Sequence, residues 1–250
     1  MGRAGRMVAG GIVAAMLTGC AAGPSQAGAT TATASVAAPS SASPSAGPSS
    51  RWQAVGDVDG DGRPDRARLV YLGGYGPGNW ELVVDMTTLG QQVVRFTGDP
   101  ILPGNIDAPT IAGSADAERD GHADIFVKVT SGASTQFWTI FKLAGRQIRQ
   151  VTSQGQPVRL AVNGSDTQQG GFRCDGAVFV TVSEGVELPG YTAWTYERDT
   201  YTWSGAKLVL VSKRTGQVTS ARPGSPPAAY SGVSCGNLPQ YAPVYTPPTG

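Results

Sequence analysis

Acidic residues alternate with other residue types in the segment 57–65, which reads DVDGDGRPD. Four carboxylates occupy its first, third, fifth and ninth places: Asp57, Asp59, Asp61 and Asp65. Carboxylates with this spacing can converge on one Ca²⁺ ion, which takes roughly six to eight oxygen ligands. Gly62 permits the sharp turn that this convergence needs, and Arg63 at the seventh place would contribute its backbone carbonyl. The segment therefore predicts a calcium-binding loop.

A second segment, 116–124, repeats this pattern 59 positions later and reads DAERDGHAD. Its candidate side-chain ligands are Asp116, Glu118, Asp120 and Asp124. His122 stands at the seventh place, where the backbone carbonyl would bind the ion. Recurrence with the glycine in register favours a second calcium loop, because a chance acidic turn has no reason to recur in this way. The alternative is a pair of solvated Asp/Gly turns, which this composition also favours.

Strands, rather than helices, are expected to hold both loops. An EF-hand would carry a bidentate glutamate at the twelfth place, but the twelfth residues here are Arg68 and Val127. Runs rich in β-branched and aromatic residues follow the loops, at 67–71 and 125–129. Such runs are typical of β-strands, so each loop is predicted to connect two strands.

The N-terminus predicts export and lipid attachment. Two arginines precede an apolar run over 7–17, which is typical of a signal peptide and shorter than the roughly 20 residues that span a bilayer. The run ends at Leu-Thr-Gly-Cys, which resembles the bacterial lipobox and implies that Cys20 is acylated and begins the mature chain. An ordinary secretory peptide with an incidental cysteine is the alternative. We expect a signal peptide over 1–19 and an extracytoplasmic protein anchored by lipid to the cell membrane.

Residues 20–50 are predicted to form a disordered tether between the anchor and the folded part. They are almost wholly Ala, Ser, Thr, Pro and Gly, without an aromatic residue or a charge. Such a segment cannot bury enough apolar surface to offset its ordering entropy.

Two cysteines, Cys174 and Cys235, are left once Cys20 is assigned to lipid. An even pair in an oxidising compartment predicts a disulfide, which would tie the Pro-rich tail over 222–250 to the folded domain. Two buried, unpaired thiols are the alternative.

Composition predicts one all-β domain over 51–221. Glycine and proline are plentiful, at 35 and 18 residues, and no long stretch has the period of an amphipathic helix. The segment has the size of a typical single domain. The net charge of the chain is +1, without a basic run, which argues against nucleic acid as a partner.

Strand-like segments recur in the same order after each loop, which predicts an internal repeat of about sixty residues. The expected units are 51–109, 110–165 and 166–221. Trp80 and Trp138 stand 15 and 14 residues after their loop-closing aspartates and are predicted core residues. The third unit keeps Asp175 but has no carboxylate over 167–171, so no calcium is expected there.

The segment 57–65 and the strand after it resemble the FG-GAP or VCBS repeats of integrin α-subunits and of many secreted bacterial proteins. In that family a repeat of this length forms one four-stranded blade of a β-propeller, with calcium in an inter-strand loop. The resemblance implies the eight carboxylates named above as ligands. Closed propellers have roughly four to eight blades, so three units imply a partial propeller, a rearranged β-sandwich or half of an oligomer.

No enzyme motif is recognisable. His122 is the only histidine, so a Ser-His-Asp site and a histidine-based zinc site are not expected. A glycosidase needs paired carboxylates, and several stand outside the loops: Glu81, Asp85, Glu184, Glu187, Glu197 and Asp199. Solvent-facing positions on strands and loops are the favoured interpretation of these acids. The segment 191–203, which alternates apolar and charged residues, is a candidate recognition surface.

These observations favour a non-enzymatic surface lipoprotein in which calcium is structural and catalytic residues are not assigned. Its domain would act as a binding or envelope-associated module, with a protein or glycan ligand at the cell surface. The alternative is an extracellular carbohydrate-active enzyme or its accessory domain.

Overall fold

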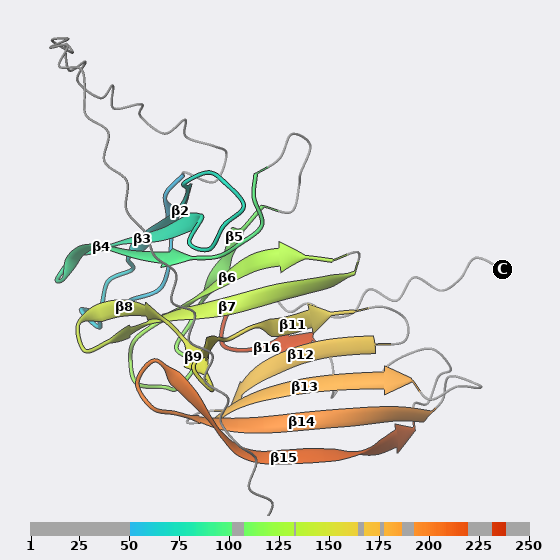
Figure 1. Ribbon diagram of the computed structural model, residues 1–250. Helices are drawn as coiled ribbons and strands as arrows, with labels where there is room; N and C mark the ends of the chain where they lie inside the picture. Colours follow the sequence, from blue (N-terminus) through green and yellow to red (C-terminus); the bar gives the residue numbers. More distant parts are fainter. Residues whose placement is uncertain are drawn as a thin grey trace, which may run out of the picture. The chain divides into compact units, whose positions relative to one another are not determined.

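The computed structural model describes residues 51–101, 108–132, 134–164, 168–175, 178–186, 193–219 and 232–238. These residues form strands and loops without a helix, so the predicted all-β class is confirmed (Figure 1). The predicted signal peptide, the lipidation site Cys20, the tether and most of the tail over 222–250 lie outside the described residues. Within the described part, no helix is long and apolar enough to cross a membrane.

The first sheet is an antiparallel meander of four strands. In order across the sheet, they are β1 (Gln53–Ala54), β2 (Arg66–Tyr71), β3 (Trp80–Met86) and β4 (Gly90–Phe96). Successive side chains of β2 alternate between faces, so Ala67 and Leu69 are buried while Arg66 is exposed. The acidic loop 57–65 connects β1 to β2, as expected for a loop between two strands.

The second sheet has five strands and carries the second acidic loop, which lies between its first two strands. They are β5 (Thr110–Ala115), β6 (Asp124–Ser131), β7 (Thr135–Ala144), β8 (Gln147–Gln150) and β11 (Leu160–Asn163). The order across the sheet is β11-β7-β6-β5, and β8 pairs with the other half of β7.

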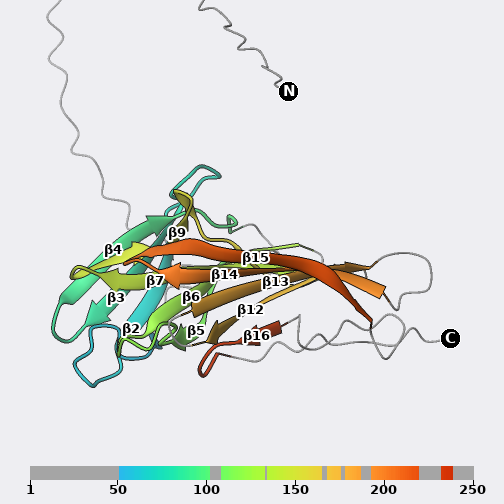
Figure 2. The same ribbon diagram turned by 90° about the horizontal axis from the view of Figure 1, so that it is seen from below.

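The third sheet has seven strands in the order β10-β9-β15-β14-β13-β12-β16. They are β9 (Thr152–Ser153), β10 (Gln156–Pro157), β12 (Gln168–Asp175), β13 (Val178–Val186), β14 (Ala193–Trp203), β15 (Lys207–Thr219) and β16 (Gly232–Ser234). The long strands β12 to β15 run side by side in both views (Figure 2). The short β16 pairs parallel with β12, and next to this pairing Cys174 and Cys235 form the predicted disulfide. A segment of the tail is therefore held against the third sheet.

Each sheet contains one run of four consecutive strands paired antiparallel, namely β1–β4, β5–β8 and β12–β15. The strand-like segments seen in the sequence fall within these runs. The third sheet departs from a plain meander, because β9, β10 and β16 extend it at its two ends.

The second sheet contributes to two hydrophobic cores. In β6, Ile125 and Val127 belong to the core shared with the first sheet, and Phe126 belongs to the core shared with the third. All three side chains are fully buried. A strand that is buried on both faces is apolar without alternation, which explains the continuous apolar run over 125–127.

Trp80 and Trp138 are both fully buried, so their prediction as core residues is confirmed. They lie in different cores, however, Trp80 in the first and Trp138 in the second. The pairing registers also show that the two tryptophans are not structurally equivalent: Leu69 pairs with Leu82, whereas Lys128, which stands at the same place after its loop, pairs with Trp138. Trp138 therefore corresponds to Leu82 and not to Trp80.

Candidate metal site and ligand groove

The first acidic loop is closed by its first carboxylate. Asp57 Oδ1 accepts hydrogen bonds from the backbone N–H groups of Gly60 and Asp61, at 2.7 and 3.0 Å. Asp57 Oδ2 accepts one from the N–H of Gly62 at 2.7 Å. The two glycines have φ angles of 77° and 85°, in the left-handed region that residues with a Cβ rarely adopt. Glycine at both places therefore lets the chain turn around the Asp57 carboxylate.

Asp65 holds the same loop from its buried side. Its Oδ2 accepts hydrogen bonds from the N–H groups of Val58 and Asp59, at 2.8 and 3.3 Å, and its Oδ1 accepts one from Thr87 at 3.4 Å. Burial raises the pKa of the Asp65 carboxyl, and the hydrogen bond from Val58 opposes that increase. Asp65 thus organises the loop, and it lies outside the group of carboxylates that converge.

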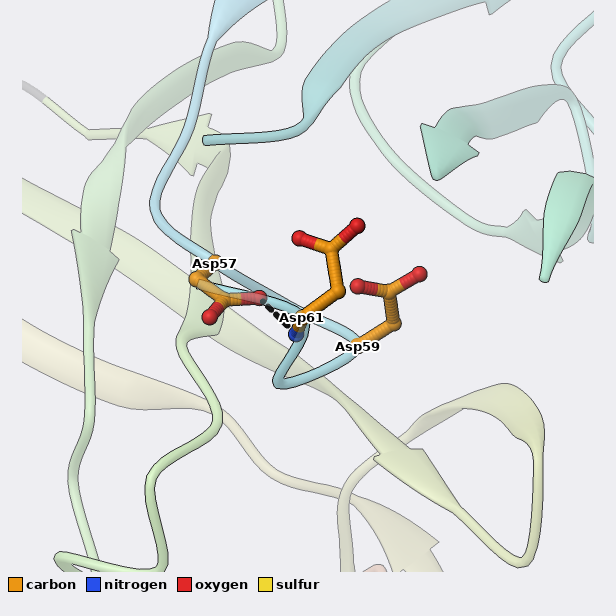
Figure 3. A group of neighbouring side chains, drawn as sticks. All are labelled: Asp57, Asp59 and Asp61. Atoms are coloured by element: carbon orange, nitrogen blue, oxygen red, sulfur yellow. Dashed lines mark hydrogen bonds between the residues drawn. The ribbon is translucent and has the colours of Figure 1, made fainter. Parts of the chain in front are cut away.

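Three predicted ligands do converge. Asp57, Asp59 and Asp61 each bring one carboxylate oxygen to within 4.8 Å of the others, and Figure 3 shows the Asp59 and Asp61 carboxylates side by side. Asp59 Oδ1 is buried without a hydrogen-bond partner, an arrangement that costs about 1–3 kcal/mol unless another group satisfies the oxygen. A bound cation would satisfy it and would offset the repulsion among the carboxylates. These three residues can therefore hold a metal ion.

Thr88, in the turn between β3 and β4, orients two members of this triad. Its N–H donates to Asp59 Oδ2 at 2.9 Å, and its Oγ1 donates to Asp61 Oδ2 at 3.2 Å. Groups that hydrogen-bond to ligating carboxylates fix their direction. The site is thus supported by two segments of the first sheet that are separate in sequence.

The second loop folds in the same way as the first. Asp116 accepts hydrogen bonds from the N–H groups of Asp120 and Gly121, at 3.0 and 2.9 Å, which are the counterparts of the bonds made by Asp57. Arg119 occupies the place of Gly60 and has the same left-handed backbone, with φ angles of 60° and 77°. The sequence repeat between the two loops therefore reflects a repeat in backbone structure.

A lysine distinguishes the surroundings of the second loop from those of the first. Lys142 in β7 forms an ion pair with Glu118, and its Nζ lies 3.7 Å from Asp120 Oδ2. Burial lowers the pKa of Lys142, and the charge of Asp116 opposes that decrease. Within the described residues, the carboxylates of this loop do not form a converging triad like that of the first loop.

The remaining predicted loop residues have structural surroundings of their own. Asp124 is buried, accepts a hydrogen bond from the N–H of Ala117 at 3.2 Å, and has a pKa raised well above its usual range by that burial. The Arg63 side chain is exposed, and the backbone N–H of this residue donates to Asp61 Oδ1 at 2.8 Å. His122 reaches the first loop, where its Nδ1 lies 3.2 Å from the Val58 carbonyl oxygen.

Two features of this region were missed by sequence reasoning. One is the contact between the loops, in which the N–H of Ala123 donates to the carbonyl of Asp57 at 2.6 Å. The other is Lys142, which the sequence could have indicated, because it is the only charged residue in the mostly apolar segment 137–143. A charged residue inside such a run needs a partner when buried.

A separate groove lies between strands of the second and third sheets. It comprises a cavity of about 760 Å³ and an adjoining one of about 260 Å³, both of which are lined by Ala161 and Glu197. The lining includes the aromatic ring of Phe137 and the polar side chains of Asn163, Thr195 and Gln217. Hydroxyl and amide groups beside an aromatic ring provide directional contacts for a polar ligand.

Two of the acids considered for glycosidase chemistry line this groove. Glu197 and Asp199 stand at alternate places of β14, so their side chains point to the same face. Glu197 is paired with Lys213 at 2.7 Å, and Asp199 accepts a hydrogen bond from the Tyr201 hydroxyl at 3.3 Å.

The other candidate acids are not brought to the groove. Glu81 is paired with Arg95 at 3.1 Å on the first sheet, and Asp85 is exposed there. Glu187 and the side chain of Glu184 lie outside the described residues, as does Tyr191 at the start of the candidate recognition segment.

No protein-family description, no curated protein and no solved structure matches this chain.

Proposed function

We propose that this protein is a secreted lipoprotein, anchored to the cell membrane through Cys20, whose β domain is stabilised by Ca²⁺ and acts as a non-enzymatic binding or envelope-associated module. The main support for a bound metal ion is the triad of Asp57, Asp59 and Asp61, in which one Asp59 oxygen is buried without a hydrogen-bond partner. The leader sequence supports the anchor.

Calcium is the ion that suits this site best. Carboxylate oxygens favour hard cations such as Ca²⁺, Mg²⁺ and Mn²⁺, and a flexible glycine-containing loop fits the variable coordination of Ca²⁺ better than the strict octahedron of Mg²⁺. The ion would be structural, because the triad lies in a loop that Thr88 and Asp65 already fix to the first sheet.

FG-GAP-like units remain part of the proposal. The three four-stranded runs support it, because in two of them a loop of the same backbone structure connects the first two strands. A partial propeller is the arrangement that three such units would allow, because a closed ring needs at least about four blades.

The groove is the proposed ligand site, and a neutral glycan is the ligand class that its lining favours. Side chains such as Asn163, Thr195 and Gln217 can exchange hydrogen bonds with sugar hydroxyls. The Phe137 ring, which has the Arg159 guanidinium 4.9 Å from its centre, adds aromatic contact area to the lining. Screening the purified protein against a glycan array tests this assignment. If Gln217→Ala loses a glycan signal that the surface variant Arg95→Ala retains, the glycan binds in the groove.

Calcium titration followed by calorimetry and thermal melting tests the metal. Calcium at one hundred times its dissociation constant would raise the free energy of unfolding by about 2.7 kcal/mol. Asp61→Asn should remove both binding and stabilisation, whereas Arg63→Ala should retain them because its side chain is exposed. Equal melting temperatures in chelator and in millimolar calcium would refute the proposal.

A carbohydrate-active enzyme is the second candidate, supported by Glu197 and Asp199 on one face of the groove. Glycosidases use two carboxyl groups roughly 5 to 10 Å apart. Release of reducing sugar from a polysaccharide, abolished in both Glu197→Gln and Asp199→Asn, would establish it. Retained ligand binding without turnover would favour the binding module.

A further inference from the structure

The two acidic loops share a backbone structure but face different side chains at one position of the neighbouring strand. Arg66 and Ile125, the residues directly after the two loops, pair with Asp85 and Phe141. The next residue along each partner strand is Met86 in the first sheet and Lys142 in the second. Lys142 therefore stands where the first sheet has Met86, and both side chains are almost wholly buried, at 2% and 3% exposed.

The Lys142 ammonium group is enclosed by the second loop and by the third sheet. It forms the ion pair with Glu118 and lies 3.7 Å from the Asp120 carboxylate. The centre of the Trp203 ring is 5.0 Å from Nζ, within the range of a cation–π contact. A buried ammonium persists only with such partners.

We infer that Lys142 supplies the positive charge of the second loop in place of a metal ion, so that the protein binds one divalent cation and not two. The inference rests on the proposed metal site of the first loop. Glu118 and Asp120 are the counterparts of Asp59 and Asp61, the residues whose carboxylates converge in the first loop. A divalent ion on the same carboxylates would be repelled by the lysine.

The length of the Glu118 side chain, which stands at the third ligand place where the first loop has Asp59, agrees with an ion pair to Lys142. Asp59 in the first loop accepts a hydrogen bond from Thr88 and leaves its Oδ1 without a partner, whereas Glu118 extends to the lysine on β7. The second loop is therefore tied directly to β7 by an ion pair, and the first loop is tied to its own sheet through Thr88.

Calcium stoichiometry, measured by calorimetry on the purified chain, tests the inference. One ion is expected in the wild type, lost in Asp61→Asn and retained in Asp120→Asn. Lys142→Met, which places the residue of the first sheet at this position, should bind a second ion. Lys213→Met, which removes an exposed lysine from an ion pair, should leave the stoichiometry at one. Two ions in the wild type would overturn the inference.

Stability in excess chelator provides a readout that does not depend on metal binding. Glu118→Gln removes the partner of a buried ammonium and should lower the melting temperature by about 5 °C or more, equally in chelator and in calcium. An unchanged melting temperature in chelator would overturn the role of Lys142. If the wild type binds no ion but Glu118→Gln is destabilised, the lysine inference stands and the calcium proposal fails. If Lys142→Met does not fold, the melting temperatures of Glu118→Gln and the wild type in chelator still test the role of Lys142.

Discussion

The imidazole of His122 lies directly over the backbone of Gly60, so closely that a Cβ atom added to Gly60 would be 2.6 Å from its Cε1 atom. This contact joins the two acidic loops, which are 59 positions apart in the chain. The Val58 carbonyl oxygen, 3.2 Å from His122 Nδ1, belongs to the same contact. The loops therefore pack against each other, and a change at their junction affects both.

Gly60→Ala is expected to destabilise the protein more than Gly62→Ala. Both glycines have left-handed backbones, but a Cβ at Gly60 would meet His122, whereas one at Gly62 would meet nothing within 4 Å. Backbone strain alone costs about 1–3 kcal/mol, and the clash adds to it at Gly60 only. Urea unfolding of both variants measures the difference. In a protein that also carries His122→Ala, the loss of unfolding free energy caused by Gly60→Ala should approach that caused by Gly62→Ala. Equal losses for the two single variants would contradict the contact.

Cys20→Ser is expected to release the protein from the membrane. The change removes the thiol that the lipobox-like sequence would present for acylation, and without acyl chains the apolar run is too short to span a bilayer. Fractionation of bacterial cells that express the full chain, with detection in the membrane and soluble fractions, measures the effect. Persistence of the variant in the membrane fraction at the wild-type level would contradict lipid anchoring.

Reduction or mutation of the disulfide is expected to destabilise the third sheet. The bond joins residues 61 positions apart, and closing a loop of this size stabilises a protein by about 4 kcal/mol. The double variant Cys174→Ser/Cys235→Ser should therefore unfold at a lower urea concentration, to the same extent as the reduced wild type. Identical midpoints for the oxidised and reduced wild type would show that the bond does not constrain the unfolded chain.

Stability is expected to fall at alkaline pH through Tyr201. Burial raises the pKa of its hydroxyl above the ordinary value of 10.0, and the negative charge of Asp199 raises it further. The unfolded chain therefore loses this proton first, and stability decreases as the pH rises above 10 and up to the pKa of the folded state. Urea unfolding between pH 9 and about 11 should show a smaller decrease in Tyr201→Phe. The same slope in both proteins would contradict the assignment.

Local patterns in the sequence were sufficient to predict much of the fold and the first loop. Runs rich in β-branched and aromatic residues identified β2 and β6, because this composition is a property of residues adjacent in the chain. The spacing of Asp57, Asp59 and Asp61 predicted their convergence, since a turn of a few residues with glycine at the required places sets it.

The same local patterns could not distinguish the surroundings of the two loops. Glu118 matches the ligand pattern of Asp59, yet its carboxylate pairs with Lys142 from β7. The register of β6 against β7 decides which side chain faces the loop, and this register depends on packing across two sheets. Trp80 and Trp138 illustrate the same limit, because they have similar spacing from their loops in the sequence but lie in different cores.

The sequence by itself determined the all-β class and the turn structure of both acidic loops, because the composition of strand-forming runs and the closure of a short loop are set by neighbouring residues. The sequence also predicted a disulfide from its even pair of cysteines, although only the fold placed Cys174 and Cys235 within bonding distance. Tertiary structure alone decided that His122 covers Gly60, that Lys142 reaches the second loop, and that Glu197 and Asp199 line a groove. These relationships join residues from different strands, whose register and packing follow from the burial of the whole core.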